Sequence, residues 1–305
     1  MFEDTEINLV VSIGSQKKSI DDIARDLGIL SEGARELLEY AYSRCIVNKS
    51  HGERYTISDF SSRFDHFAKF EYWNEFPAGD RKKIDQRFLN EFINRYKRDI
   101  EQEKSNIKEF NPLPNDTVML LDEVEEMVNA ANLIVVQPCD CRILGDNCDR
   151  PVETCISLDE GARQILERGH GHLLTKEEAV HLLRWADKKG LMHTADNAWK
   201  EQSLHSICNC CACDCYPFRA AQQLGTKGVW PKSRYQAVFN QDLCSLCGAC
   251  VKRCHFQAFS LTEQLVEING KIKQNVRYDV DKCWGCGLCA NYCPQDDITM
   301  RPLVS

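Results

Sequence analysis

The chain has 305 residues, of which 43% are hydrophobic and 28% charged, and its formal net charge is −8. This is an ordinary globular composition, which excludes extensive disorder, and the length allows two or three domains of roughly 100–200 residues. The acidic balance argues against opportunistic binding to nucleic acid.

Eighteen cysteines stand out in this composition. The acidic start, Met1–Glu6, lacks the basic segment of a signal peptide, and no apolar run approaches the ~20 residues that cross a bilayer. We therefore expect a cytoplasmic protein without a membrane span. In a reducing cytoplasm, metal ligation rather than disulfide formation is the expected use of cysteine.

Residues 1–75 are predicted to form a small domain of helices and a two-stranded ribbon. Ser19 and Asp22 form a capping-box pattern at the start of one helix, and Ser31 opens the next. Residues 48–52 favour a turn, and residues 54–58 favour a strand. The order of helix, turn, helix and ribbon resembles the winged helix-turn-helix superfamily, which implies either DNA binding or protein docking.

The charges of this segment favour protein docking over DNA. Residues 1–80 hold 15 Asp or Glu and 9 Lys or Arg, a net charge of −6. The helix that would read DNA carries Glu32, Glu36 and Glu39, which phosphates would repel. Cys45, at the end of that helix, is expected to be a small buried hydrophobe rather than a redox group.

Residues 76–114 are predicted to be a helical connector. A charged helix over residues 76–110 carries one apolar stripe, typical of a helix that packs across two domains. Pro112 and Pro114 are expected to end it.

Residues 115–227 are predicted to form a cysteine-rich α+β domain. We expect helices at 118–128, 159–168 and 175–188 and a strand at 133–137. Nine cysteines occur in this domain: Cys139, Cys141, Cys148, Cys155, Cys208, Cys210, Cys211, Cys213 and Cys215. If the chain is extended there, residues two apart face the same side, which would align Cys139 with Cys141 and would align Cys211, Cys213 and Cys215.

Nine cysteines in two groups are too many for buried free thiols alone. We favour one or two further iron–sulfur clusters, with zinc and unliganded thiols as the alternatives. The predicted grouping assigns one centre to Cys139, Cys141, Cys208 and Cys210. A second centre would draw on Cys148, Cys155, Cys211, Cys213 and Cys215. No glycine-rich phosphate loop is present, so the sequence offers no support for nucleotide or flavin binding.

Residues 228–305 contain the pattern C-x2-C-x2-C-x3-C twice, at an offset of 39 residues. Zinc sites rarely use such runs, whereas a cluster of four irons needs four thiolates. The repeat resembles bacterial-type ferredoxins with two [4Fe-4S] clusters, a βαβ pseudo-repeat. The spacing predicts one cluster on Cys244, Cys247, Cys250 and Cys293, and a second on Cys283, Cys286, Cys289 and Cys254, because the fourth cysteine of each run points to the other cluster.

Two features depart from the compact ferredoxin pattern. His255 replaces the usual proline after the first run, which is expected to alter hydrogen bonding near one cluster. A longer insert contains Asn269-Gly270, a hairpin signal. The cysteine-rich domain resembles regions that precede dicluster ferredoxin segments in iron–sulfur proteins of anaerobes.

The predicted fold class is therefore α+β multidomain. The predicted function is a cytoplasmic electron-transfer protein that relays single electrons to or from a partner oxidoreductase. It is expected to be a carrier or an electron-transfer subunit rather than a stand-alone enzyme. Two alternatives stay open: a redox-sensing winged-helix regulator, and a redox enzyme whose middle domain holds a substrate-binding cluster.

Overall fold

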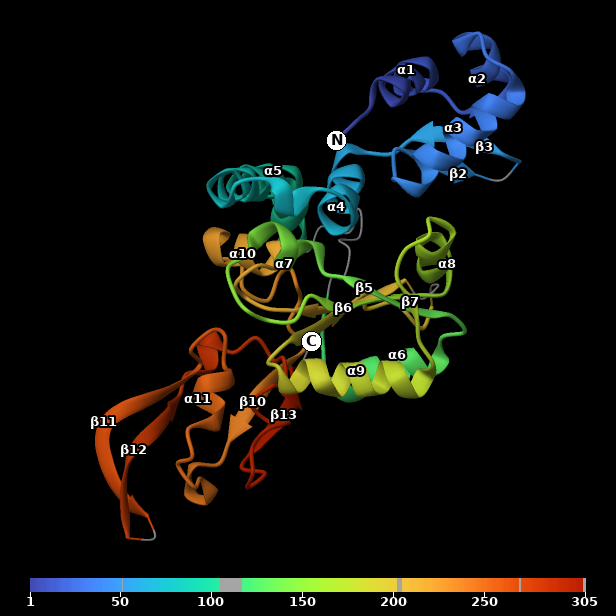
Figure 1. Cartoon of the computed structure of the whole chain (residues 1–305). Coiled ribbons are helices and arrows are strands. Elements are labelled where there is room, and N and C mark those ends of the chain that lie inside the picture. The colour runs from blue at the N-terminus through green and yellow to red at the C-terminus, as the bar shows by residue number, and fades with distance from the viewer. Residues whose placement is uncertain (51, 105–116, 202–204, 269, 304–305) are drawn as a thin grey trace. The chain divides into compact units, whose positions relative to one another are not determined.

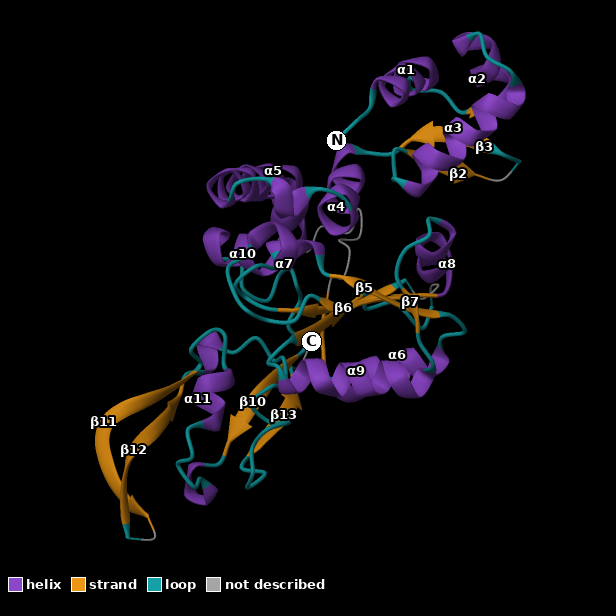
Figure 2. Ribbon diagram, viewed as in Figure 1, coloured by secondary structure: helices purple, strands orange, loops and turns teal. Residues whose placement is uncertain are grey.

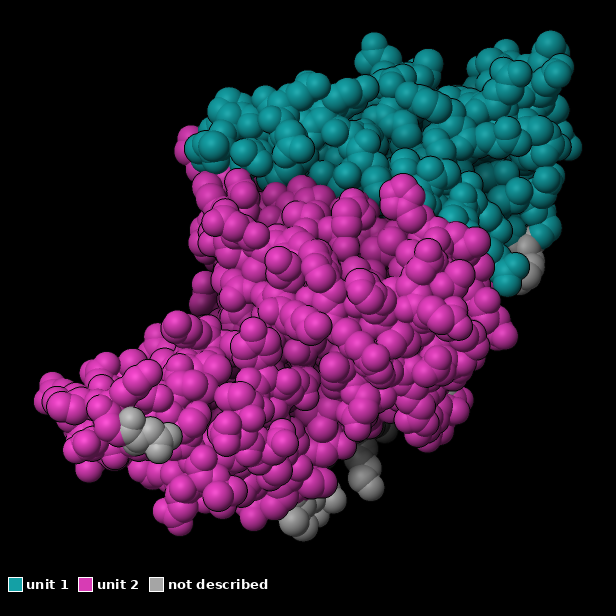
Figure 3. Space-filling view, turned by 60° about the horizontal axis from the view of Figure 1, so that its bottom comes forward, with its two compact units in different colours: residues 1–81, 163–171 teal, residues 82–162, 172–305 magenta. Residues whose placement is uncertain are grey.

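The computed structural model describes residues 1–50, 52–104, 117–201, 205–268 and 270–303. These residues form two compact units, coloured separately in Figure 3. Unit 1 comprises Met1–Arg81 and Arg163–Gly171, and unit 2 comprises Lys82–Ala162 and His172–Ser305. Across the described ranges, no helix combines the length and the apolar character that a bilayer crossing requires.

Unit 1 is a small three-stranded sheet covered by helices, with strand order β1-β3-β2. Its core contains Leu9, Ile23, Leu38 and Tyr55, each almost fully buried. The elements are α1 (Asp4–Ile13), β1 (Lys18–Ser19), α2 (Ile20–Leu27), α3 (Ser31–Ser43), β2 (Val47–Ser50), β3 (Arg54–Ile57), α4 (Phe60–Phe70) and the short helix η1 (Trp73–Glu75).

Local signals account for most of these boundaries. The Ser19 side chain caps α2, and the Asp22 carboxylate accepts a hydrogen bond from the Ser19 amide, as the capping-box pattern predicts. The predicted turn at residues 48–52 is wrong in part, because Asn48 pairs with Thr56 inside the β2–β3 ribbon. Cys45 is half-buried rather than buried.

Four charged side chains form a network in unit 1. Arg63 donates to Glu71 at 2.6 Å, and Arg44 donates to both Glu6 at 2.7 Å and Glu71 at 2.9 Å. The Glu6 side chain is fully buried, so its charge requires these cationic partners. The network ties α1 to the end of α3 and to α4.

Unit 2 contains α5 (Ala78–Lys104), which begins in unit 1, and a six-stranded antiparallel sheet of order β4-β8-β9-β6-β5-β7. The elements of the sheet region are β4 (Thr117–Met119), α6 (Leu121–Ala130), β5 (Ile134–Pro138), α7 (Asp140–Gly145), β6 (Glu153–Leu158), α8 (Asp159–Glu167), β7 (His172–Leu173), α9 (Lys176–Lys188), β8 (Met192–Ala195), β9 (Ser206–Cys210) and α10 (Tyr216–Leu224).

The predicted elements of this region are largely found. The helix expected at 118–128 begins only at Leu121, because residues 117–119 pair with β8 as a strand. Thr175 caps α9 with the expected capping box. The helix break at Pro112 and Pro114 lies outside the described residues.

The two faces of the sheet have different chemistry. Helices α6 and α9 cover one face (Figures 1 and 2), where Ile134, Ile156 and Ile207 join an apolar core. Side chains alternate along a strand, so Cys208 and Cys210 on β9 point to the opposite face, which α10 covers with Phe218. The sheet thereby separates an apolar core from a cysteine-rich side.

The C-terminal part of unit 2 is built from two antiparallel strand pairs, β10 with β13 and β11 with β12. The elements are β10 (Tyr235–Phe239), η2 (Gln241–Leu243), α11 (Ala249–Arg253), β11 (Phe259–Ile268), β12 (Lys271–Tyr278), η3 (Val280–Lys282) and β13 (Ile298–Pro302). The predicted hairpin joins β11 and β12, and its Asn269 lies outside the described residues.

His66 provides a pH test of unit 1. Its ring packs against His170 at 4.7 Å between centroids, and burial, together with the His170 charge, lowers the pKa of His66 to about 3. An unfolded histidine has a pKa near 6.5, so the unfolded chain binds more protons between about pH 3 and pH 6.5. The free energy of unfolding of unit 1 should therefore fall as pH is lowered through that window, by about 1.4 kcal/mol per pH unit.

Amide hydrogen exchange of α4 in the full chain at pH 5 and pH 7, corrected for intrinsic exchange rates, measures this dependence. His66→Phe should flatten it, whereas replacement of the exposed His181 by Gln should leave it unchanged. Protection of α4 that is equal at both pH values in the unmodified chain would contradict the prediction.

Candidate metal centres

The two cysteine runs of the C-terminal part share one backbone conformation. Left-handed residues occur in pairs 39 positions apart: Leu246 (φ 52°) with Gly285 (φ 68°), and Gly248 (φ 72°) with Gly287 (φ 77°). The amide of Leu246 donates to Cys244 Sγ at 3.4 Å, and the amide of Gly285 donates to Cys283 Sγ at the same distance. The sequence offset is therefore a structural repeat.

The first group of sulfurs gathers around Cys250. Burial raises the pKa of the Cys250 thiol to about 12, and the neighbouring sulfurs of Cys244 and Cys247 add to the shift. Asp297, which is 4% exposed, accepts hydrogen bonds from both Cys293 and Cys244. Cys293, from the second run, thus lies beside the first.

The second group of sulfurs gathers around Cys286 and includes one cysteine from the first run. Burial raises the pKa of Cys286 to about 12, and the nearby sulfurs of Cys283 and Cys254 contribute. Burial also raises the pKa of Cys289, and the nearby sulfurs of Cys283 and Cys254 contribute to this shift as well. Cys254, the last cysteine of the first run, therefore lies among the sulfurs of the second run.

These groups fit the requirements of iron–sulfur clusters. Six of the eight sulfurs lie in an apolar cluster with Ala237, Phe259 and Ile298, and backbone amides point at three of them. Cys247 is exposed. Gly285 lies so close to Tyr235 that a Cβ there would be 2.0 Å from the Tyr235 carbonyl oxygen. Soft thiolates in apolar surroundings with amides directed at them form the environment in which such clusters are bound.

In the sheet region, six cysteines form a closed ring of neighbouring thiols. Cys139 contacts Cys141 and Cys155, Cys208 contacts Cys155 and Cys210, and Cys215 contacts Cys210 and Cys141. The distance between the Cys210 and Cys215 sulfurs is 3.5 Å.

Hydrogen bonds from Cys208 and Cys215 hold the pKa of Cys210 well below its ordinary value. The same bonds, together with Cys155, Cys141 and burial, raise the pKa of Cys208 and Cys215. Within the ring, these hydrogen bonds favour the thiolate form at Cys210, and the thiolate is the form that binds a metal.

The ring differs from the predicted grouping. Cys155 and Cys215 were assigned to a second centre, but both belong to the ring. Cys155 joins it because the β6–β9 register, with Ile156 opposite Ile207, brings Cys155 opposite Cys208. Cys215 joins because the chain turns back after β9 and α10 begins at Tyr216.

The assumption of an extended chain is also wrong. Strand β5 ends at Pro138 and α7 begins at Asp140, so Cys139 and Cys141 lie at a strand–helix junction. Their sulfurs still lie within 4.8 Å of each other. Cys211 and Cys213 occupy the turn after β9 and lie away from Cys215.

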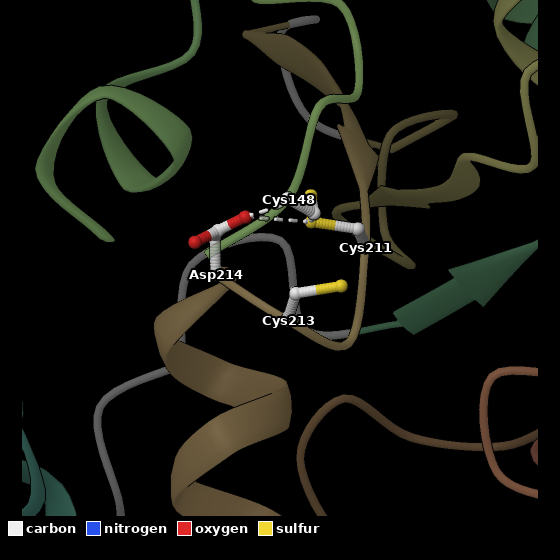
Figure 4. Close-up of side chains that lie close together, drawn as sticks. All are labelled: Cys148, Cys211, Cys213 and Asp214. Atoms are coloured by element: carbon white, nitrogen blue, oxygen red, sulfur yellow. Dashed lines mark hydrogen bonds between the residues drawn. The ribbon is translucent and has the colours of Figure 1, made fainter. Parts of the chain in front are cut away.

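The remaining three cysteines form a separate site with a carboxylate. Ligand atoms of Cys148, Cys211, Cys213 and Asp214 all lie within 4.8 Å of one another. Figure 4 shows Cys148 and Cys211 converging on the Asp214 carboxylate. Sequence reasoning missed Asp214, although its place between Cys213 and Cys215 was a usable signal.

The side chain of Arg142 is buried near sulfurs of both the ring of six cysteines and the three-cysteine site. Arg142 donates to the Asn209 carbonyl at 2.7 Å and to Thr154. Burial alone would lower its pKa, but the surrounding sulfurs, Cys139 and Cys155 foremost, raise it above the ordinary value. The guanidinium therefore stays charged and offsets part of the thiolate charge.

Three aromatic rings connect the ring of six sulfurs with the second ferredoxin run. Phe218 lies 5.0 Å from Trp284 and 5.7 Å from Phe256, and Phe256 stacks on Trp284 at 4.7 Å, all between centroids. Cys208, Cys210, Cys215 and Cys286 belong to the same apolar cluster. Phe218 was not predicted to take part, because it lies far from the ferredoxin run in sequence.

Polar contacts also join the ferredoxin region to the end of α9 and to the residues that follow it. Arg253 and Asn291 both bond to Asp187 at the end of α9, the latter at 2.8 Å. The carbonyl of Gly190 lies 2.7 Å from His255 Nε2, which must therefore donate. His255 thus anchors the ferredoxin region to the turn between α9 and β8, and the predicted effect of His255 on hydrogen bonding near one cluster stays a prediction.

Comparison with known proteins agrees with the C-terminal geometry. Residues 243–296 match the family model of the 4Fe-4S dicluster domain. Over 75 residues the chain is 35% identical to pyruvate synthase subunit PorD of Thermotoga maritima, a match that covers 25% of this chain and 65% of that relative's length. The chain therefore carries a ferredoxin-type [4Fe-4S] dicluster domain, which confirms the C-terminal prediction.

Gly285 offers a test of the cluster loop. Gly285→Ala would drive a Cβ into the Tyr235 carbonyl, so the loop around Cys283 and Cys286 should not close and about four irons should be lost per chain. Gly248→Ala is the matched control, because Gly248 has the same left-handed backbone and a Cβ added there would meet no atom within 4 Å. Iron and sulfide analysis of the full chain measures the loss, and equal iron contents in the two variants would contradict the prediction.

Proposed function

We propose that this chain is a cytoplasmic iron–sulfur electron carrier, or the electron-transfer subunit of an oxidoreductase. The dicluster match at residues 243–296 carries this proposal. A [4Fe-4S] cluster with four thiolate ligands exchanges one electron and performs no bond chemistry.

The proposed ligands follow the two sulfur groups. Cys244, Cys247, Cys250 and Cys293 hold one cluster, which the contacts of Asp297 with Cys244 and Cys293 support. Cys283, Cys286, Cys289 and Cys254 hold the other, supported by the position of Cys254 among the second-run sulfurs.

We further propose a third iron–sulfur cluster at the ring of six cysteines. Six thiols offer four soft ligands and two further sulfurs, and the raised pKa of Arg142 keeps a positive charge beside them. Trp284 and Phe218, 4% and 0% exposed, exclude water between this ring and Cys286. This arrangement supports a relay between the middle region and the ferredoxin region.

The domain proposal keeps the predicted boundaries: a winged-helix-like domain at 1–75, a helical connector at 76–114, a cysteine-rich metal-binding domain at 115–227 and the ferredoxin domain at 228–305. The order α1-β1-α2-α3-β2-β3 and the β1-β3-β2 sheet support the winged-helix assignment.

Protein docking is the proposed role of the winged-helix-like domain. Glu32, Glu36 and Glu39 are exposed on α3, and Arg35 of that helix is paired with Glu53 at 3.1 Å. Such a surface is repelled by phosphates. The regulator alternative requires the opposite result: salt-sensitive binding to duplex DNA that depends on the clusters.

The proposed partner is an oxidoreductase. The relative named as a pyruvate synthase subunit supports this class of partner. Lys252, Lys271 and Arg277 are exposed on the ferredoxin region, which suits an acidic docking surface.

Spectroelectrochemical titration of the full chain, purified without oxygen, tests the carrier function. We expect reversible uptake of about two electrons by the ferredoxin region, one for each cluster. A Cys247→Ser/Cys286→Ser double variant should lose this capacity, whereas Cys45→Ser in unit 1 should keep it. Irreversible loss of iron on the first reduction would contradict a carrier function.

Substitution of Trp284 tests whether this side chain keeps water away from Cys283 and Cys286. Trp284→Ala admits water beside Cys283 and Cys286, and water stabilises the extra negative charge of a reduced centre. The midpoint potential of one centre should rise by about 60 mV, which corresponds to a tenfold change in a one-electron equilibrium. Tyr292→Ala, at a 51% exposed aromatic of the same run, is the control for a redox titration followed by electron paramagnetic resonance. Equal potentials in the two variants would contradict the prediction.

A further inference from the structure

The site of Cys148, Cys211, Cys213 and Asp214 has the dimensions of a single ion. Cys148 Sγ lies 3.8 Å from Cys211 Sγ, and Asp214 Oδ2 lies 3.0 Å and 3.4 Å from these two sulfurs. A zinc ion with Zn–S bonds of about 2.3 Å places tetrahedral sulfur ligands about 3.8 Å apart. The carboxylate among these ligand atoms also departs from the four thiolates that hold a [4Fe-4S] cluster.

The carboxylate is held in a ligand orientation. Asp214 is fully buried, and its Oδ1 accepts hydrogen bonds from the amide and the side chain of Asn147, each at 2.9 Å. Oδ2 is thereby directed at the sulfurs. This division, with one oxygen held by neighbours and the other facing the thiolates, is typical of the supporting contacts around a bound metal.

The loop that carries Asn147 is itself fixed. Lys82 donates to the Gly145 carbonyl at 2.5 Å, to the Asp146 carbonyl at 2.6 Å and to Asn147 Oδ1 at 3.0 Å. A Cβ on Gly145 would lie 2.4 Å from Asp214 Oδ1, so glycine is required for the carboxylate to occupy this position.

The donor set suits a cation. If the three cysteines bind as thiolates, they and the Asp214 carboxylate carry four negative charges in a largely buried site, where such charges need cations beside them. Arg150 donates to Cys213 Sγ at 3.4 Å, and the charge of Arg142 acts on Cys211. A divalent ion together with these two arginines balances the four ligands.

We propose that Cys148, Cys211, Cys213 and Asp214 bind one tetrahedral zinc ion, separate from the iron–sulfur clusters. Zinc with four protein ligands and no open position serves a structural role. The ion joins the loop after α7 to the turn between β9 and α10, and this turn connects Cys210 with Cys215 of the ring of six. It is therefore a structural ion beside the proposed third cluster, which keeps its own ligands, and it carries no electrons itself.

Metal analysis of the full chain, purified without oxygen, tests the proposal. We expect one zinc per chain in the unmodified protein. Cys148→Ser and Asp214→Asn should lose the zinc and keep the iron and sulfide content, and the retained iron shows that these variants fold. Asp149→Asn, at the exposed aspartate next to Cys148, should keep the zinc.

Two further measurements distinguish the loss of a metal ligand from a disturbance of packing. Co²⁺ substituted for zinc should give thiolate-to-metal charge-transfer and tetrahedral ligand-field bands, which Cys148→Ser should abolish. Asn147→Ala, which removes the second donor to Asp214 but no ligand, should weaken zinc binding about 10–100-fold in a chelator competition.

Two results would overturn the proposal. One is the loss of about four irons and four sulfides together from Cys148→Ser, which would assign this site to a cluster. The other is an unmodified chain that contains no zinc.

Discussion

A buried thiolate needs a positive charge beside it, and this constraint organises unit 2. Seventeen of the eighteen cysteines lie in that unit, most of them partly or fully buried. Desolvated negative sulfurs without cations would destabilise any fold. The chain meets the constraint with buried Arg142, with backbone amides directed at sulfurs and, in our proposals, with metal centres. In these proposals, the stability of unit 2 depends on the metal centres that it binds.

One segment links the proposed centres. Strand β9 supplies Cys208 and Cys210 to the ring of six, the turn that follows supplies Cys211, Cys213 and Asp214 to the proposed zinc site, and α10 places Phe218 against Trp284. A substitution in this segment would therefore affect the ring of six, the proposed zinc site and the contact between Phe218 and Trp284. Unit 1, in contrast, holds one cysteine. Buried Glu6 and Arg63 of this unit are satisfied by arginine–carboxylate pairs, and buried Arg168 donates to backbone carbonyls.

The difference between what could and could not be predicted follows from the sequence distance between ligands. The eight ferredoxin cysteines lie in two short runs whose spacers fix the geometry locally, so the pattern alone predicts them as cluster ligands. The middle ligands come from separate segments, and their grouping depends on strand register, such as the β6–β9 pairing that brings Cys155 to Cys208. Spacing does not encode that register. It also does not reveal that the Asp214 carboxylate lies among the sulfurs of Cys148, Cys211 and Cys213.

The central claim is that a ring of six cysteines binds a third cluster beside the two of the ferredoxin domain. Iron and acid-labile sulfide counts per chain, made on the full protein purified without oxygen, test it most directly. Three clusters predict about twelve irons and twelve sulfides, whereas two clusters alone give about eight of each. A count of about eight would contradict the claim.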